Sequence, residues 1–403
     1  MQARRPAPAG PVVAAFLMTL SSAFGQTYFI ALFAPWLKAE LGLTDGTFGG
    51  LYTLANVASA AVLIWAGGLA DRFRIRWLAV VVLLGLAVCC AAMASNTSVI
   101  LLLPILFGLR LFGQGSLGHL SMTGVGRWYE RRRGRMMSLA VLGLPASEAA
   151  LPIVAVALIG TLGWRPTWLV AAAALCLVSV PLVLVFLRNE PPTQRISRNF
   201  ATERRHGQWT RAEVLRRPEF FLLLSGVIAP SFVMTAVFFH QVYLVEVKGW
   251  TLDWFVSWFP AFAGVSVLAA LLTGAIIDRL DARRLLPLFL LPMAGGVLVL
   301  CLFDSRYAVP AFMVLGAITN GSAKTLLGAI WAELFGTRHL GAIRSLAFGV
   351  QVFASALAPG LIGVLLDLGV SLELQYLAMS IYATAASLTL WLLLPSLYRL
   401  SPS

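Results

Sequence analysis

The stretch GGLADRFRIR, residues 67 to 76, places one aspartate and three arginines in a chain in which only 12% of residues are charged. A second copy, GAIIDRLDARR, begins at Gly274. The two share the pattern GxxxDRxxxR, with Asp71 and Asp278 in matching places at an offset of 207 residues. Because this offset is about half of the 403-residue chain, it indicates an internal duplication.

A second pair of polar segments supports the same offset. ERRRGRMMS, residues 130 to 138, aligns with TRHLGAIRS, residues 337 to 345. The alignment matches Arg131 with Arg338, Gly134 with Gly341 and Ser138 with Ser345. Two separate segments agree on one offset, so the halves are interpreted as copies of one unit.

The composition indicates a polytopic membrane protein. Hydrophobic residues make up 59% of the chain and the mean hydropathy is +0.86, whereas soluble domains are roughly 45 to 50% apolar. A helix needs about 20 mostly apolar residues to cross a bilayer. Twelve such stretches fit, at about residues 11–36, 47–70, 77–96, 98–126, 137–160, 165–188, 219–246, 253–277, 284–303, 307–332, 343–366 and 373–397.

The expected fold is therefore all-α, with twelve transmembrane helices in two six-helix repeats. Residues 1–188 form the first bundle and residues 219–403 the second. The linker, residues 189–218, is rich in arginine, and its end, TRAEVLRRPEFF, is expected to form a short surface helix. The start, MQARRPAPAG, is expected to lead into a retained first helix rather than a cleaved signal peptide.

Basic residues mark one side of the membrane. Of the 30 Lys and Arg residues, 24 fall in alternate loops and near both termini. The positive-inside rule places these segments, and both termini, in the cytoplasm of a plasma or inner membrane. The net charge of +13 is thus mostly a topology signal, and nucleic-acid binding is not expected.

The sequence offers no chemistry for an enzyme or a metal site. The four cysteines lie in apolar spans, and the four histidines form no pair with metal-ligand spacing. Motifs of the HExxH, GxSxG and GxxxxGK[ST] kinds are absent. We expect no enzyme activity, no cofactor and no metal.

GGLADRFRIR resembles the loop between helices two and three of the major facilitator superfamily, whose usual form is GxLaDRxGrR. GLRLFGQG, residues 108 to 115, resembles that superfamily's helix-four motif, an arginine followed by a GxG-like turn. The sequence departs from the pattern at Arg74 and Ile75, and the helix-five antiporter motif is not matched. The loops at 129–143 and 333–345 resemble those of monocarboxylate and oxalate/formate-type transporters, although the arginine that some of these carry in helix eight is missing.

Charged residues within the spans are the best candidates for function, because a charge at the bilayer centre costs at least about 2.5 to 3.5 kcal/mol. Arg110 lies in span four, Glu148 in span five and Lys324 in span ten. The resemblance implies that these spans face a central cavity. We expect Arg110 and Lys324 to attract the substrate and Glu148, helped by His240, to carry a coupling proton.

Three alternatives remain open: Arg110 and Glu148 form only a structural ion pair, Lys324 only extends toward the cytoplasm, and His240 is only a satisfied interfacial histidine. Other polar residues expected to shape specificity are Gln26, Tyr28, Asn56, Gln114, Asn320 and Gln351. The residues expected to act in gating are Gly67, Asp71, Arg72, Arg131, Gly274, Asp278, Arg279 and Arg338.

Together these features predict a secondary transporter that works by alternating access. The preferred substrate is a small organic anion, such as a monocarboxylate, moved with protons. The alternative is an exporter of amphipathic or cationic compounds, and a receptor or membrane enzyme is a remote third. The expected partners are the substrate, the lipid bilayer and a proton, and the chain is expected to act as a monomer.

Overall fold

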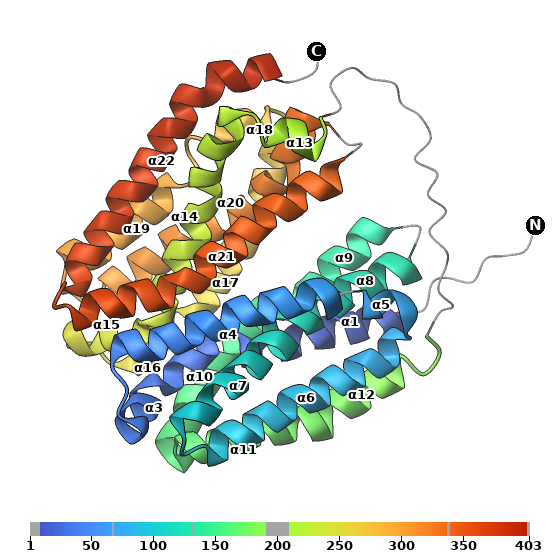
Figure 1. Cartoon of the computed structure of the whole chain (residues 1–403), viewed down its shortest axis with the longest axis vertical. Coiled ribbons are helices and arrows are strands. Elements are labelled where there is room, and N and C mark those ends of the chain that lie inside the picture. Colours follow the sequence, from blue (N-terminus) through green and yellow to red (C-terminus); the bar gives the residue numbers. More distant parts are fainter. Residues whose placement is uncertain (1–8, 67, 130–131, 191–208, 337–338, 401–403) are drawn as a thin grey trace, which may run out of the picture. The chain divides into compact units, whose positions relative to one another are not determined.

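The computed structural model describes residues 9–66, 68–129, 132–190, 209–336 and 339–400. Throughout these residues the regular elements are helices (Figure 1). In hydrocarbon a segment must satisfy its own backbone hydrogen bonds, and the helix does so. The chain divides into two compact units, unit 1 with Met1–Leu43 and Leu51–Asn199, and unit 2 with Thr44–Gly50 and Phe200–Ser403.

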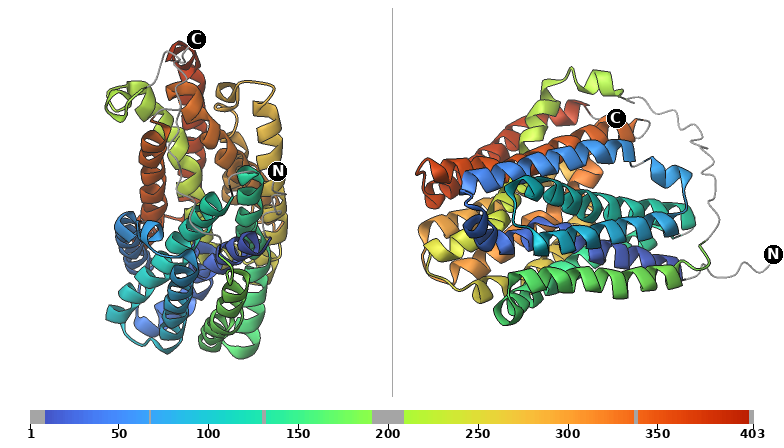
Figure 2. Two further views of the ribbon diagram at one scale, coloured as in Figure 1. Left: turned by 90° about the vertical axis from the view of Figure 1, so that its right-hand side faces the viewer. Right: turned by 60° about the horizontal axis from the view of Figure 1, so that its bottom comes forward.

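The helices up to the linker run in the order α1 (Gly10–Ser21), η1 (Ser22–Gly25), α2 (Thr27–Ile30), η2 (Ala31–Phe33), α3 (Ala34–Leu41), α4 (Asp45–Ala66), α5 (Leu69–Arg72), α6 (Ile75–Ser95), α7 (Val99–Gly108), η3 (Leu109–Leu117), α8 (Gly118–Trp128), α9 (Arg133–Val141), α10 (Gly143–Leu162), α11 (Trp164–Ala174), η4 (Leu175–Ser179) and α12 (Val180–Phe186). Here α1 packs against α8, α9 and α10. In turn α6 packs against α11 and lies beside α12, as both views in Figure 2 show.

The later helices are α13 (Arg211–Val214), α14 (Pro218–Phe239), α15 (Gln241–Val247), α16 (Leu252–Val256), α17 (Phe259–Ile277), α18 (Ala282–Leu285), α19 (Leu291–Leu302), α20 (Ala308–Phe335), α21 (Leu340–Asp367) and α22 (Leu372–Leu400). Within unit 2, α20 packs against α17 and α19, and α14 packs against α21. The pair α19 and α22 repeats the pair α6 and α11, because each joins the third and sixth spans of its half.

Within the described residues, nine helices are long and apolar enough to cross a membrane. A tenth span is the pair Gly10–Gly25 and Thr27–Leu41, which is bent by 42°. The other two predicted spans correspond to α19, a short apolar helix, and to α20, whose 28 residues include the polar Asn320 and Lys324. Each of the twelve predicted spans thus corresponds to a helix or a pair of helices in the structure.

The predicted surface helix near the end of the linker is shorter than expected. Thr210 and Glu213 form a capping box that starts α13, but this helix ends after four residues and Pro218 begins α14 separately. The backbone N–H of Trp209 donates to the carbonyl of Phe335, over 3.1 Å. The end of the linker is thus attached to the last turn of α20.

Each unit has two ends that differ in charge. We call the end with residues 72–76 in unit 1, and that with residues 278–284 in unit 2, the basic end. The far end is the opposite one, with residues 95–98 and 163–165 in unit 1 and residues 303–307 and 368–373 in unit 2. Because successive spans alternate in direction, these loops fall on opposite ends of each unit.

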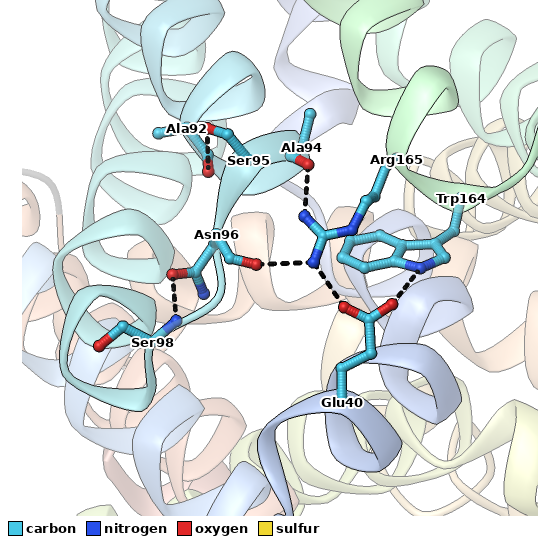
Figure 3. A network of polar contacts seen from close by, with 8 residues as sticks. All are labelled: Glu40, Ala92, Ala94, Ser95, Asn96, Ser98, Trp164 and Arg165. Carbon is cyan, nitrogen blue, oxygen red and sulfur yellow. Dashed lines mark hydrogen bonds and ion pairs between the residues drawn. The ribbon is translucent and has the colours of Figure 1, made fainter.

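A polar brace joins three segments at the far end of unit 1 (Figure 3). One Arg165 nitrogen, Nη2, donates to the carboxylate of Glu40 over 2.5 Å and to the carbonyl of Asn96 over 3.0 Å. The other, Nη1, donates to the carbonyl of Ala94 over 2.6 Å, and the indole N–H of Trp164 donates to Glu40 over 3.0 Å. The brace therefore ties α3 to the α6–α7 loop and to α11.

Unit 2 has a brace in the corresponding place with its charges exchanged. The ammonium group of Lys248 lies 2.6 Å from the carboxylate of Asp304 and 3.2 Å from that of Glu373. Burial disfavours the charge on Lys248, but its hydrogen bonds to Asp304 and Glu373 outweigh this and raise its pKa. The brace ties the end of α15 to the segment after α19 and to the start of α22.

The two braces are related by one offset. Glu40, Asn96 and Arg165 correspond to Lys248, Asp304 and Glu373 at an offset of 208 residues. The acid of one brace aligns with the base of the other, so the duplication extends to the far ends, where the residue types no longer match. An ion pair works in either polarity, which explains why the geometry persists while the residues differ.

This correspondence predicts that the unit 1 brace tolerates reversal of both charges but not of one. Glu40→Lys places a cation against Arg165 and should lower the melting temperature by about 1 to 3 °C, since an exposed ion pair contributes up to about 1 kcal/mol. Adding Arg165→Glu should recover most of the loss, because the double variant imitates unit 2. Thermal unfolding of the detergent-purified chain measures both, and losses that simply add would contradict the prediction.

Candidate functional site

The candidate site of unit 1 begins at a break in the first span. The helix α1 tightens into the 3₁₀ turn η1, and Gln26 then adopts an extended conformation with φ −84° and ψ 152° before α2 starts. At such a break the usual i to i+4 pattern is interrupted, and carbonyl oxygens become available to other donors. The carbonyl of Gly25 accepts a hydrogen bond from Arg110 Nη1 over 2.9 Å.

Arg110 is buried, with 1% of its surface exposed, and is surrounded by neutral dipoles. Its Nε donates to Asn56 Oδ1 over 3.1 Å, and Nη1 also reaches the hydroxyl of Thr27 over 3.4 Å. The ring of Tyr52 lies 5.2 Å from the guanidinium carbon. Among the described residues Nη2 has no hydrogen-bond partner. The guanidinium is thus fixed by three helical segments and retains one unused donor group.

The helix that carries Arg110 is widened at this place. Residues Leu109–Leu117 form the π-helical segment η3, which continues α7 and leads into α8 as one span. The segment that resembles the GxG-like turn is thus part of the predicted span, and the chain stays helical there. Gly113 serves instead for close approach: a Cβ on Gly25 would lie 2.7 Å from the Cα of Gly113. This contact between two glycines brings η1 against η3.

Glu148 lies apart from these hydrogen bonds of Arg110. It is half-buried on α10, next to Ser147, whose hydroxyl is 3.4 Å from that of Tyr28. Glu148 lies within electrostatic range of the Tyr28 hydroxyl. The structure thus brings Glu148 toward Tyr28, whereas the hydrogen bonds of Arg110 go to Asn56, Gly25 and Thr27. The guanidinium of Arg110 is therefore held by these neutral groups and not by the ion pair with Glu148 that the sequence left open.

The polar candidates of unit 2 are used mainly in contacts between helices. Asn320 donates to the hydroxyl of Ser266 over 3.0 Å, which joins α20 to α17. Gln351 donates to the carbonyl of Val227 over 3.4 Å. His240 is buried where α14 ends, and its Nδ1 lies 3.1 Å from the carbonyl of Ala236. Lys324 is exposed and makes no hydrogen bond or ion pair with any residue that the structure describes.

The other predicted residues are placed as follows. Gln26 is half-buried at the break in the first span, and Gln114 is exposed on η3. Arg72, Asp278 and Arg279 are exposed at the basic ends, and Gly274 lies in the last turn of α17. Gly67, Arg131, Arg338 and the side chain of Asp71 lie outside the part that the structure describes. The gating role stays a prediction.

Sequence reasoning missed Thr27 and Tyr52, which complete the surroundings of Arg110. The hydroxyl groups of these two residues lie 2.8 Å apart. Tyr52 precedes Asn56 by four residues, and side chains at this spacing share a helix face. The spacing of Tyr52 and Asn56 on one face of span two could have indicated that Tyr52 belongs to the site. No comparable feature of the sequence predicted the break in the first span that places Thr27.

Comparison with known proteins identifies relatives of this chain. The family model described as Major Facilitator Superfamily matches residues 15–359. An MFS-type efflux pump of Mycolicibacterium smegmatis is 26% identical over 250 residues, which cover 59% of this chain and 56% of that protein. The chain thus matches only a little over half the length of this curated relative.

Solved structures of transporters share the fold. A bacterial homologue of the human lysosomal transporter Spinster is similar with a TM-score of 0.78 at 14% identity, covering 99% of both chains. A D-xylose-proton symporter is similar with a TM-score of 0.69 at 15% identity, covering 95% of this chain and 97% of its own. At these identities the similarity concerns the fold alone.

The contacts of Arg110 predict a structural requirement that lysine cannot meet. A lysine has one ammonium group and cannot reach Asn56, Gly25 and the face of Tyr52 together. Arg110→Lys should therefore lower the stability of the substrate-free protein by about 1.5 to 3 kcal/mol for each charged hydrogen bond lost. Thermal unfolding in detergent measures this loss. Lys324→Ala is the control, and equal melting temperatures for both variants would contradict the prediction.

Proposed function

Because the chain belongs to the major facilitator superfamily, and is thus a multi-pass membrane transporter and not an enzyme, we propose that it exports amphipathic, cationic compounds in exchange for protons. The observation that carries this proposal is the contrast between Arg110 and Glu148. The cation is enclosed and bound within unit 1, and the acid is half-buried on α10.

Arg110 is poorly suited to attract an anion. Its hydrogen bonds and the ring of Tyr52 hold it inside unit 1, where 1% of its surface is exposed. A substrate carboxylate would have to replace these partners. It would also have to lose its own bound water on entering unit 1, which costs free energy. We therefore assign Arg110 to the architecture of the first span and not to substrate binding.

Glu148 has the properties required for exchange. A carboxylate within a span is costly unless a proton or a cation neutralises it. Since one carboxylate cannot hold a proton and a substrate cation at once, the two compete for Glu148. Competition of this kind links export of the cation to entry of the proton. Tyr28 and Ser147 lie next to this position.

Two further observations support export. The curated relative is named as an efflux pump, although the match is 26% identical and partial. The positive-inside rule applied to 24 of the 30 basic residues assigns the basic ends and both termini to the cytoplasm. In this orientation the proton gradient across the cell membrane drives export by exchange. We assign gating to the GxxxDRxxxR segments that begin at Gly67 and Gly274.

Transport of an organic anion is the second candidate, and Lys324 is the observation that favours it. Its ammonium group is exposed on α20 and makes no ion pair with the described residues. A carboxylate substrate could neutralise it. Lys324→Ala discriminates the two candidates: it should leave export of cations unchanged, and it should abolish uptake of anions if that is the function.

Replacement of Glu148 tests the proposed exchange directly. In liposomes with an imposed pH gradient, the protein should move cationic dyes, and Glu148→Gln should remove the dependence of this movement on the gradient. Glu246→Gln, an exposed residue of α15, is the matched control. Unchanged proton coupling in Glu148→Gln would assign the coupling to another residue. Uptake of labelled organic acids without any movement of dyes would overturn the exporter proposal.

A further inference from the structure

Four aromatic rings fix the end of the linker at the basic end of unit 2, where α13 and α18 lie (Figure 1). Trp331 and Phe335, near the end of α20, stack with their ring centres 6.2 Å apart. The ring centre of Phe220, at the start of α14, lies 5.8 Å from that of Trp331. The ring of Trp209 meets the edge of Phe335 at 6.2 Å between centres. These contacts and the backbone hydrogen bond from Trp209 to Phe335 attach the linker to two spans.

Three exposed arginines lie beside these rings. The guanidinium carbon of Arg217 lies 4.7 Å from the ring centre of Trp209. Arg211 starts α13, and Arg216 lies in the turn after it. Among the residues that the structure describes, none of the three guanidinium groups makes a hydrogen bond or an ion pair. Their donors therefore remain unused within this part of the chain.

Two acids nearby do not neutralise the three arginines. The carboxylate of Glu213 belongs to the capping box of α13, where it accepts from the backbone N–H of Thr210 over 2.7 Å and from its hydroxyl over 2.9 Å. Glu219 is half-buried in the first turn of α14. Three arginines against two acids leave a net positive charge on an exposed surface.

The arginines lie at the depth of the lipid headgroups. The helix α14 is long and apolar enough to cross the membrane, and it begins at Pro218. Near its start, the exposed fractions of Phe221 and Leu222 are 53% and 44%. Water would solvate these side chains poorly, so hydrocarbon is expected to begin at this level. Arg217 precedes Phe221 by four residues, which is about 6 Å along a helix. The headgroup layer is about 5 to 7 Å thick.

We propose that Arg211, Arg216 and Arg217 bind an anionic phospholipid, with its phosphate on the guanidinium groups and its acyl chains along Phe221 and Leu222. A guanidinium group binds phosphate oxygens through paired hydrogen bonds. Basic clusters next to a membrane-crossing helix attract anionic lipid. Free phosphate offers the same oxygens but no acyl chain to cover the exposed apolar side chains, so the surface fits the lipid better.

This site is specific to the second half of the chain. An offset of 207 places Ala9 and Gly10 at the positions of Arg216 and Arg217. A bound lipid would hold the end of the linker and the end of α20 at the membrane surface. Because α20 ends shortly before the predicted gating residue Arg338, lipid binding should influence the rate of transport. That influence rests on the transport function proposed above, whereas the lipid site does not.

Native mass spectrometry of the full-length chain tests the lipid site without transport. The chain in detergent is titrated with phosphatidylglycerol, with phosphatidylcholine and with inorganic phosphate. Phosphatidylglycerol should bind more tightly than phosphatidylcholine, and inorganic phosphate should not displace it. Combining Arg216→Gln with Arg217→Gln should weaken the binding of phosphatidylglycerol by about fivefold for each arginine. Arg216→Gln alone keeps Arg217 on Trp209 and should weaken it by about fivefold.

A matched double variant distinguishes a defined site from general attraction by a basic surface. Arg344→Gln with Arg399→Gln removes the same charge from two other exposed positions of unit 2 and should keep the tight binding. Equal weakening in the two double variants would overturn the proposal. Unchanged binding in the Arg216 and Arg217 variant would overturn it too, and displacement by inorganic phosphate would show that the surface takes a free anion and not the lipid.

Dye export by liposomes tests the influence on transport. The liposomes contain phosphatidylcholine with or without phosphatidylglycerol, and variants are compared within one composition, because anionic lipid also attracts cationic dyes. Phosphatidylglycerol should change the rate of the unaltered chain and of the Arg344 and Arg399 variant more than that of the Arg216 and Arg217 variant. An equal change in all three would overturn this influence. Loss of all dye movement with intact lipid binding would overturn the proposed function and support the lipid site.

Discussion

The desolvation of one guanidinium determines much of the architecture of unit 1. Arg110 sits in a span where water cannot solvate it, so its donors need acceptors from the protein. Regular helices offer few, because their carbonyl groups are already used. The break after Gly25 supplies a free carbonyl, and Asn56 supplies an amide oxygen. The π-helical turn and the contact between Gly25 and Gly113 bring these acceptors within reach.

The internal duplication can be recognised from the sequence at the basic ends of the two units but not at their far ends. At the basic ends, Asp71 and Asp278 match residue by residue, and the offset can be found by alignment. At the far ends, Arg165 pairs with Glu40, whereas Glu373 pairs with Lys248. What the halves share there is an ion pair between equivalent helices. Alignment of residue types cannot detect a pair whose charges have been exchanged, but coordinates can.

The fold was predictable and the partners of the site were not, for a physical reason. The length and apolar character of each span are properties of local sequence, and they placed twelve helices near their observed positions. The surroundings of Arg110 depend on the rotation of three helices and on the break at Gln26, which are tertiary properties. Glu148 was the natural partner by charge alone, yet neutral groups surround Arg110.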